Sequence, residues 1–130
     1  MNALDYFNAR LQATISPMDY LIANKNNPEA YVLIDVSNGP AHVRHTTIKE
    51  AIVIPEKELQ SRIDEIPKDK EVIVYCWDVW CNTAAKSAKY LLEKGYTVKE
   101  LTGGIAAWQE MNFPISKTIQ EDDTENHCGC

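Results

Sequence analysis

Four cysteines are the residues of this 130-residue chain best suited to chemistry. They fall as two close pairs, Cys76 with Cys81 and Cys128 with Cys130. Neither pair has the repeated C-x-x-C spacing of a structural zinc site. A chain of this length buries about two-thirds of its unfolded surface and needs no disulfide framework to be stable. The spacing is therefore compatible with reactive thiols.

Cys76 stands directly after the best strand candidate of the chain. Residues 71–75 form a nearly continuous apolar run, which is typical of a strand buried on both faces. A short loop, residues 77–81, then leads into a helix expected over residues 82–94. Loop N–H groups and the positive end of a helix favour a thiolate, which is the nucleophilic form of cysteine. A buried structural cysteine is the alternative, and the strand–cysteine–helix pattern alone leaves both open.

The rest of the chain alternates between short apolar runs and helix-forming segments, as α/β proteins with a parallel sheet do. Further strands are expected at 31–36, 51–54 and 97–101, and helices at 2–14, 16–24, 56–63 and 105–111. The inward positions are expected to be Leu59 and Ile63 in one helix, and Ala85, Ala88, Leu91 and Leu92 in helix 82–94. We expect three parts: a helical extension (1–15), one α/β domain (16–115) and a flexible acidic tail (116–130).

Composition argues against several classes of function. Lysine and arginine number 13 against 19 acidic residues, a net charge of -6, whereas nucleic-acid binders normally show a basic face. No apolar run approaches the roughly 20 residues of a membrane helix. The first residues lack the basic start and apolar core of a signal peptide. We therefore expect a cytoplasmic protein that binds neither nucleic acid nor membrane.

Several segments together resemble the rhodanese family. They are Tyr75-Cys76 with its short loop and alanine-rich helix, the lone Gly95, the segment Leu101-Thr102-Gly103-Gly104-Ile105-Ala106-Ala107-Trp108, and, in the family's order, Ser16-Pro17, Leu33-Ile34-Asp35-Val36 and Ala51-Ile52-Val53-Ile54-Pro55. The resemblance implies an α/β, rhodanese-like three-layer fold with a mostly parallel central sheet flanked by helices. It also implies a sulfurtransferase in which Cys76 carries a persulfide, with no metal or organic cofactor. The implied partners are a small sulfur donor and a thiol acceptor, such as a thioredoxin-like or other thiol protein.

The chain departs from the family's pattern at three places. Ser37 stands where relatives often have an arginine, and Thr47-Ile48-Lys49-Glu50-Ala51 keeps only the isoleucine and alanine of a His-Ile-x-Gly-Ala stretch. Cys81 takes the position of an arginine that ends the active loop in many relatives. The resulting loop, Cys-Trp-x-x-x-Cys-Asn, resembles that of a bacterial rhodanese-like subgroup. Cysteine phosphatases of similar architecture need an arginine at the position of Asn82, so phosphoryl transfer is not expected.

The active loop supplies the expected substrate-binding residues: Trp77, Asp78, Val79, Trp80, Cys81 and Asn82. The two tryptophans form either an apolar rim for a substrate or partner, or packing against neighbouring helices. Cys81 either resolves a modified Cys76 as a disulfide or merely fills the arginine position. We expect the second, because a curved loop holds two sulfurs apart. Asp35 is expected to be structural, and Trp108 to lie in the core.

The C-terminal His127-Cys128-Gly129-Cys130 is not explained by the resemblance. Its soft donors suit a thiophilic metal ion, and its thiols suit sulfur acceptance; an inert solvated tail is the alternative. The three histidines, His42, His45 and His127, show no metal-binding spacing, and we assign no metal site. Two other functions stay open: a thiol–disulfide redox protein using Cys76 and Cys81 or the tail cysteines, and a non-catalytic binding module with the rhodanese fold.

Overall fold

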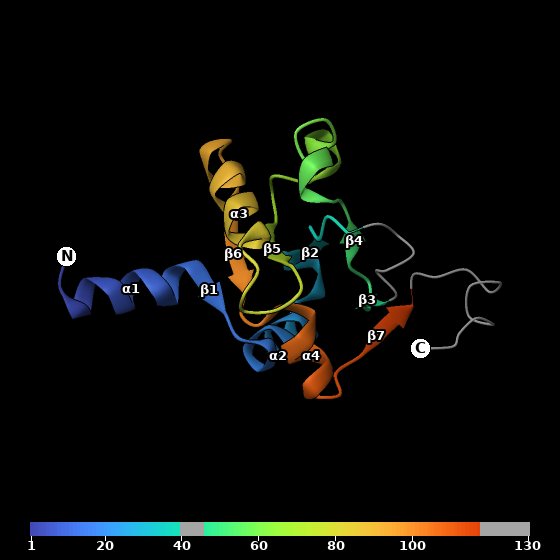
Figure 1. The fold of residues 1–130 in the computed structure, drawn as a ribbon, viewed down its shortest axis with the longest axis horizontal. Coiled ribbons are helices and arrows are strands. Elements are labelled where there is room, and N and C mark those ends of the chain that lie inside the picture. The colour runs from blue at the N-terminus through green and yellow to red at the C-terminus, as the bar shows by residue number, and fades with distance from the viewer. Residues whose placement is uncertain (40–45, 118–130) are drawn as a thin grey trace.

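The computed structural model describes residues 1–39 and 46–117 (Figure 1). Its main sheet has five parallel strands in the order β1-β6-β5-β2-β4. The strands are β1 (Thr14–Ile15), β2 (Tyr31–Asp35), β4 (Ile52–Val53), β5 (Glu71–Tyr75) and β6 (Thr97–Leu101). The expected parallel α/β sheet is confirmed. Because the strands are parallel, their carboxyl ends, including the end of β5 just before Cys76, meet at one edge of the sheet.

Helices cover both faces of this sheet. Figure 1 shows α3 (Thr83–Glu93) on one side and α2 (Pro17–Asn26) with α4 (Gly104–Glu110) on the other. Alternate residues of a strand point to opposite faces, so Val72 and Val74 pack in the core cluster on the α3 side, while Ile73 and Tyr75 pack in the cluster on the α2 and α4 side. This two-sided burial is the reason that β5 reads as an unbroken apolar run. Trp108 of α4 is 2% exposed and lies in the core, as expected.

The first helix, α1 (Ala3–Ala13), buries no side chain and extends away from the sheet (Figure 1). Asn2 and Asp5 cap its start reciprocally. At its other end, the Lys99 ammonium donates to the carbonyl oxygens of Leu11 and Gln12, at 3.3 and 2.7 Å. The chain then turns into β1, a two-residue edge strand that we did not predict.

A second, two-stranded antiparallel sheet joins β3 (Thr46–Ile48) to β7 (Ile115–Lys117). Neither strand was predicted. Residues 116 and 117, which we expected to begin the flexible tail, therefore pair with Thr47 and Thr46. His42 and His45 lie outside the described residues, as does the rest of the tail with His127, Cys128 and Cys130.

Three short 3-10 helices, η1 (Pro28–Ala30), η2 (Glu56–Glu58) and η3 (Ile63–Glu65), complete the described elements. The helix predicted over 56–63 is wrong: η2 stands at its start and η3 begins at its last residue. The N–H groups of Leu59 and Ile66 donate to carbonyl oxygens three residues back, which is the 3-10 pattern and not the α-helical one. Leu59 is nevertheless buried.

The buried face of α3 also differs from the expected one. Its buried side chains are Ala84, Ser87 and Leu91, whereas Ala85 and Leu92 are exposed. Ser87 can lie on the core side because its hydroxyl donates to the carbonyl oxygen of Thr83, at 2.9 Å, within the helix. None of the helices among the described residues has the length and apolar character required to cross a membrane.

Candidate active site

Cys76 follows β5, which lies between β6 and β2 at the centre of the main sheet. The cysteine is 3% exposed and belongs to the core cluster on the α3 side. The loop that follows it ends at Asn82, directly before α3. The central strand and the helix thus hold the two ends of the loop, residues 76–82, in fixed positions.

The two cysteines of this loop are joined as a disulfide, with their Cα atoms 6.6 Å apart. Our expectation that loop curvature separates these sulfurs is therefore wrong. The backbone N–H of Cys81 donates to the carbonyl oxygen of Asp78, at 3.1 Å. This bond closes a tight turn over residues 78–81 that folds the loop back, and the same curvature brings the Cys81 sulfur to Cys76.

The Gly103-Gly104 pair fastens the start of the loop. The N–H groups of Ile105 and Ala106 in α4 donate to the carbonyl oxygens of Cys76 and Trp77, each at 3.0 Å. Gly104 has a φ of +59°, and a Cβ on it would lie 2.5 Å from the Cys76 carbonyl oxygen. Only a residue without a side chain permits this approach. The glycine pair that supports the family resemblance is thus a direct contact of the active loop.

Several backbone donors of the loop are open. The N–H of Val79 donates to the carboxylate of Asp78, its neighbour. Within residues 1–39 and 46–117, the N–H groups of Trp77, Asp78, Trp80 and Asn82 make no hydrogen bond. Asn82 also provides no side-chain cap to α3. The loop therefore retains donors for an anion, the group that a thiolate or a persulfide presents.

The other loop residues divide by exposure. Trp77 is partly buried and packs against both core clusters, so its ring is mainly a packing element. Val79 and Trp80 are 81% and 71% exposed. They are the two central residues of the 78–81 turn, and they form an apolar tip beside Cys81. Trp77 thus packs against the core, whereas Trp80 is exposed, as an apolar rim for a substrate or partner would be.

A buried polar network ties together the strand ends beneath the loop. One carboxylate oxygen of Asp35 accepts the N–H of Ser37, and the other accepts the hydroxyl of Thr47, each at 3.0 Å. The Tyr75 hydroxyl accepts the N–H of Ile48, at 2.9 Å, and bonds to the Thr47 hydroxyl. Since Thr47 gives its one proton to Asp35, Tyr75 is the donor in that last bond.

This network places Asp35 in the structural role that we expected. Burial, with the charge of Asp35 as the second cause, raises the pKa of Tyr75 well above its usual value, so its hydroxyl keeps the proton that it donates to Thr47 even at alkaline pH. Sequence reasoning missed Thr47 and Tyr75. The available signal was a tyrosine next to Cys76 whose hydroxyl needs a partner when its ring is buried.

A model of the rhodanese-like domain family matches residues 18–111. The chain belongs to the rhodanese-like domain family. It is 35% identical over 91 residues to a sulfurtransferase from Allochromatium vinosum, a match that covers 67% of this chain and 79% of that protein.

Solved structures agree with the assignment of this rhodanese-like domain. A full-length protein from Lactobacillus plantarum is 31% identical, with a TM-score of 0.82 over 88% of this chain and 95% of that one. A protein from Bacillus halodurans is 30% identical, with a TM-score of 0.77 over 89% of this chain and 85% of that one. The rhodanese-like fold expected from the sequence is thereby confirmed.

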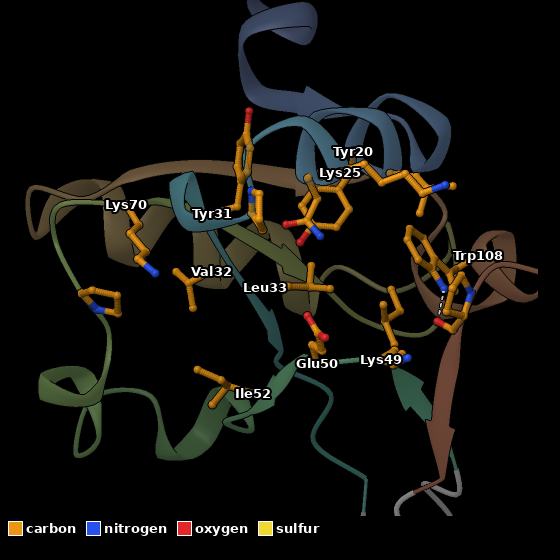
Figure 2. Close-up of a pocket in the computed structure, with 16 residues that line it drawn as sticks. Tyr20, Lys25, Tyr31, Val32, Leu33, Lys49, Glu50, Ile52, Lys70 and Trp108 are labelled. Carbon is orange, nitrogen blue, oxygen red and sulfur yellow. Dashed lines mark hydrogen bonds between the residues drawn. The ribbon is translucent and has the colours of Figure 1, made fainter.

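A cavity of about 390 Å³ lies elsewhere on the rhodanese-like domain, between α2, β2 and the start of β4 (Figure 2). Its walls include Leu33 and Trp108, and Figure 2 shows the side chains of Glu50 and Lys70 pointing into it. Burial and the charge of Glu50 raise the pKa of Tyr20, another lining residue, to about 12. Its lining residues include none of the active loop, so this cavity is separate from the site around Cys76.

Proposed function

We propose that this rhodanese-like domain is a sulfurtransferase in which Cys76 accepts a sulfane sulfur as a persulfide and passes it to a thiol. The observation that supports this most is the placement of Cys76 at the end of the central strand β5, in a loop where four N–H groups have no hydrogen-bond partner among residues 1–39 and 46–117. The relative from Allochromatium vinosum that carries the name sulfurtransferase supports the same class of reaction.

The reaction begins from the reduced loop, with Cys76 as a thiolate. The thiolate attacks the outer sulfur of a persulfide donor, R–S–SH, and forms Cys76–S–SH while the donor leaves as a thiol. The N–H groups of Trp77, Asp78, Trp80 and Asn82 are candidates for stabilising the anionic sulfur, as backbone donors do for developing charge in other active sites. A second thiol then attacks the outer sulfur and carries it away.

The position of the loop is essential to this role. Helix α4 holds the carbonyl oxygens of Cys76 and Trp77. Because the N–H of a peptide unit points away from its carbonyl oxygen, the N–H groups of Trp77 and Asp78 point away from α4. The Asp35, Thr47 and Tyr75 network holds the strand ends beneath. Because both features preorganise the loop, binding of the sulfur donor costs little conformational entropy.

The test is intact-protein mass spectrometry of the reduced, full-length chain after incubation with a low-molecular-weight thiol persulfide. At the earliest times after mixing, we expect a gain of about 32 Da, one sulfur atom, which peptide mapping assigns to Cys76. Cys76→Ser should lose this gain, whereas Cys81→Ser, the matched control in the same loop, should keep it. Unmodified wild-type protein would indicate a non-catalytic module instead, and sulfur uptake by Cys76→Ser but not by Cys81→Ser would overturn the assignment of Cys76.

A further inference from the structure

We propose that Cys81 is a resolving thiol: when no acceptor thiol takes the outer sulfur, Cys81 displaces it as hydrogen sulfide, and an external dithiol then reduces the domain. This inference rests on the proposed function, because it begins from the persulfide on Cys76. The thiolate of Cys81 attacks the inner sulfur of Cys76–S–SH. The bond between the two sulfurs of the persulfide breaks, the outer sulfur leaves as HS⁻, and the disulfide between Cys76 and Cys81 forms.

The electron balance needs a reductant once in each cycle. The sulfane sulfur gains two electrons when it leaves as sulfide, and the two cysteines lose them when they join. A dithiol then reduces the disulfide and becomes a disulfide itself. The net reaction consumes a thiol persulfide and a dithiol, and it yields a thiol, hydrogen sulfide and the oxidised dithiol.

The structure supports this step through the position of Cys81. Its sulfur is already bonded to Cys76, and the 78–81 turn that places it is closed by its own N–H. No movement of the anchored start of the loop is required, because that anchor involves the carbonyl oxygens of Cys76 and Trp77 alone. An attack within the loop therefore proceeds readily when no acceptor thiol is bound, since the effective concentration of Cys81 at Cys76 reaches the millimolar range or above.

The difference in burial between the two sulfurs sets the direction of reduction. Cys76 is 3% exposed, whereas Cys81 is only partly buried and lies next to the exposed Val79 and Trp80. An incoming thiolate therefore reaches Cys81 and expels Cys76 as the leaving thiolate. Cys76 is the better leaving group in this proposal, because loop N–H groups without a partner in the described part of the chain are available to stabilise its anion. The disulfide form has no free thiolate on Cys76, so it does not accept sulfur until it is reduced.

The experiment follows one turnover of the full-length chain, with Cys128→Ser and Cys130→Ser introduced so that the loop thiols alone contribute. The reduced protein receives one equivalent of glutathione persulfide, and mass and released sulfide are measured over time. We expect the gain of about 32 Da to be replaced by a loss of about 2 Da, with one sulfide released for each protein molecule. In the matched Cys81→Ser protein, the gain should persist, and sulfide release should be about a hundredfold slower.

The outcomes separate this inference from the proposed function. A stable gain on Cys76 in both proteins, with no sulfide released from either, overturns the resolving role of Cys81 and leaves sulfur transfer intact. Equal rates of sulfide release from the two proteins overturn it as well. No gain on either protein overturns the proposed function itself. Persulfide formation by Cys81→Ser also shows that this variant is folded, so that its slow release is not a folding defect.

Discussion

Replacing Gly104 with alanine tests whether α4 positions the active loop. The new Cβ would lie 2.5 Å from the carbonyl oxygen of Cys76 and 2.9 Å from the carbonyl carbon of Trp77. Ordinary contact begins near 3.4 Å, so the first of these distances is 0.9 Å too short (3.4 − 2.5). Both contacted atoms belong to the backbone and cannot rotate away. The loop and α4 must therefore separate.

The expected loss of stability has two causes. Alanine at a φ of +59° costs about 1 kcal/mol relative to glycine. Separation also weakens the hydrogen bonds from Ile105 and Ala106 to the loop, each worth about 1 kcal/mol. We expect Gly104→Ala to lower the free energy of unfolding by about 3 kcal/mol and to slow persulfide formation at least about tenfold, since displaced reacting groups lose that much readily.

Gly95→Ala is the matched control for this variant. Gly95 also has a positive φ, of +93°, but a Cβ there meets only the Lys68 ammonium nitrogen, at 3.7 Å. It should therefore lose only the backbone cost of about 1 kcal/mol and keep the wild-type rate. Denaturant unfolding gives the stability, and the mass increase of the reduced protein gives the rate. If Gly104→Ala matches Gly95→Ala in both measurements, α4 does not position the loop.

Three further predictions address charge, backbone strain and the buried network. The active loop has no lysine or arginine, so a thiol persulfide, whose sulfur carries at most one negative charge, should exceed the thiosulfate dianion in kcat/KM by about ten- to hundredfold. Asp78→Asn should bring the two kcat/KM values closer together, and equal efficiency in wild type would contradict the argument. Glu50 has a φ of +72°, so Glu50→Gly should raise the free energy of unfolding by up to about 1 kcal/mol in denaturant titrations, whereas Glu50→Ala should not. Tyr75→Phe removes the acceptor of the buried Ile48 N–H and should lower that free energy by about 1–3 kcal/mol; an unchanged unfolding midpoint would show that the network contributes nothing.

The strands that the sequence predicts well are those marked by a pattern within or directly beside their own residues. Strand β5 was predicted to the residue, because two-sided burial requires a nearly unbroken apolar run with β-branched residues. Strand β6 was also predicted to the residue, although it contains Lys99 and Glu100, because Gly95 before it and Gly103-Gly104 after it bound the segment. Strands β1, β3 and β7 have only two or three residues each. Such segments are strands only because a distant partner supplies their hydrogen bonds, and no local pattern records that partner.

The same reasoning explains what was predicted at the site. The place of Cys76 follows from β5 and the helix after it, both of which are local features. The bonds between Tyr75, Thr47 and Asp35 join three separate strands, and the contact of Gly104 with Cys76 joins two elements 28 residues apart. The disulfide was missed for a different reason. A turn over residues 78–81 decides whether Cys81 points to Cys76, and the spacing of two cysteines says nothing about the turn between them.

Cys81 stands where the resemblance to the family leads us to expect an arginine, and this difference has a chemical consequence for the whole site. An arginine at the end of the loop holds an anion by charge and does not react with it. A cysteine at the same place gives no charge assistance, but its thiolate can attack the sulfur bound beside it. Compared with an arginine, Cys81 would bind an anionic substrate less tightly, but it could react with the persulfide on Cys76. The loop is then suited to releasing the bound sulfur. The exposed Val79 and Trp80 lie in the turn that carries Cys81, so a reducing partner that approaches this tip meets the resolving sulfur before the buried one.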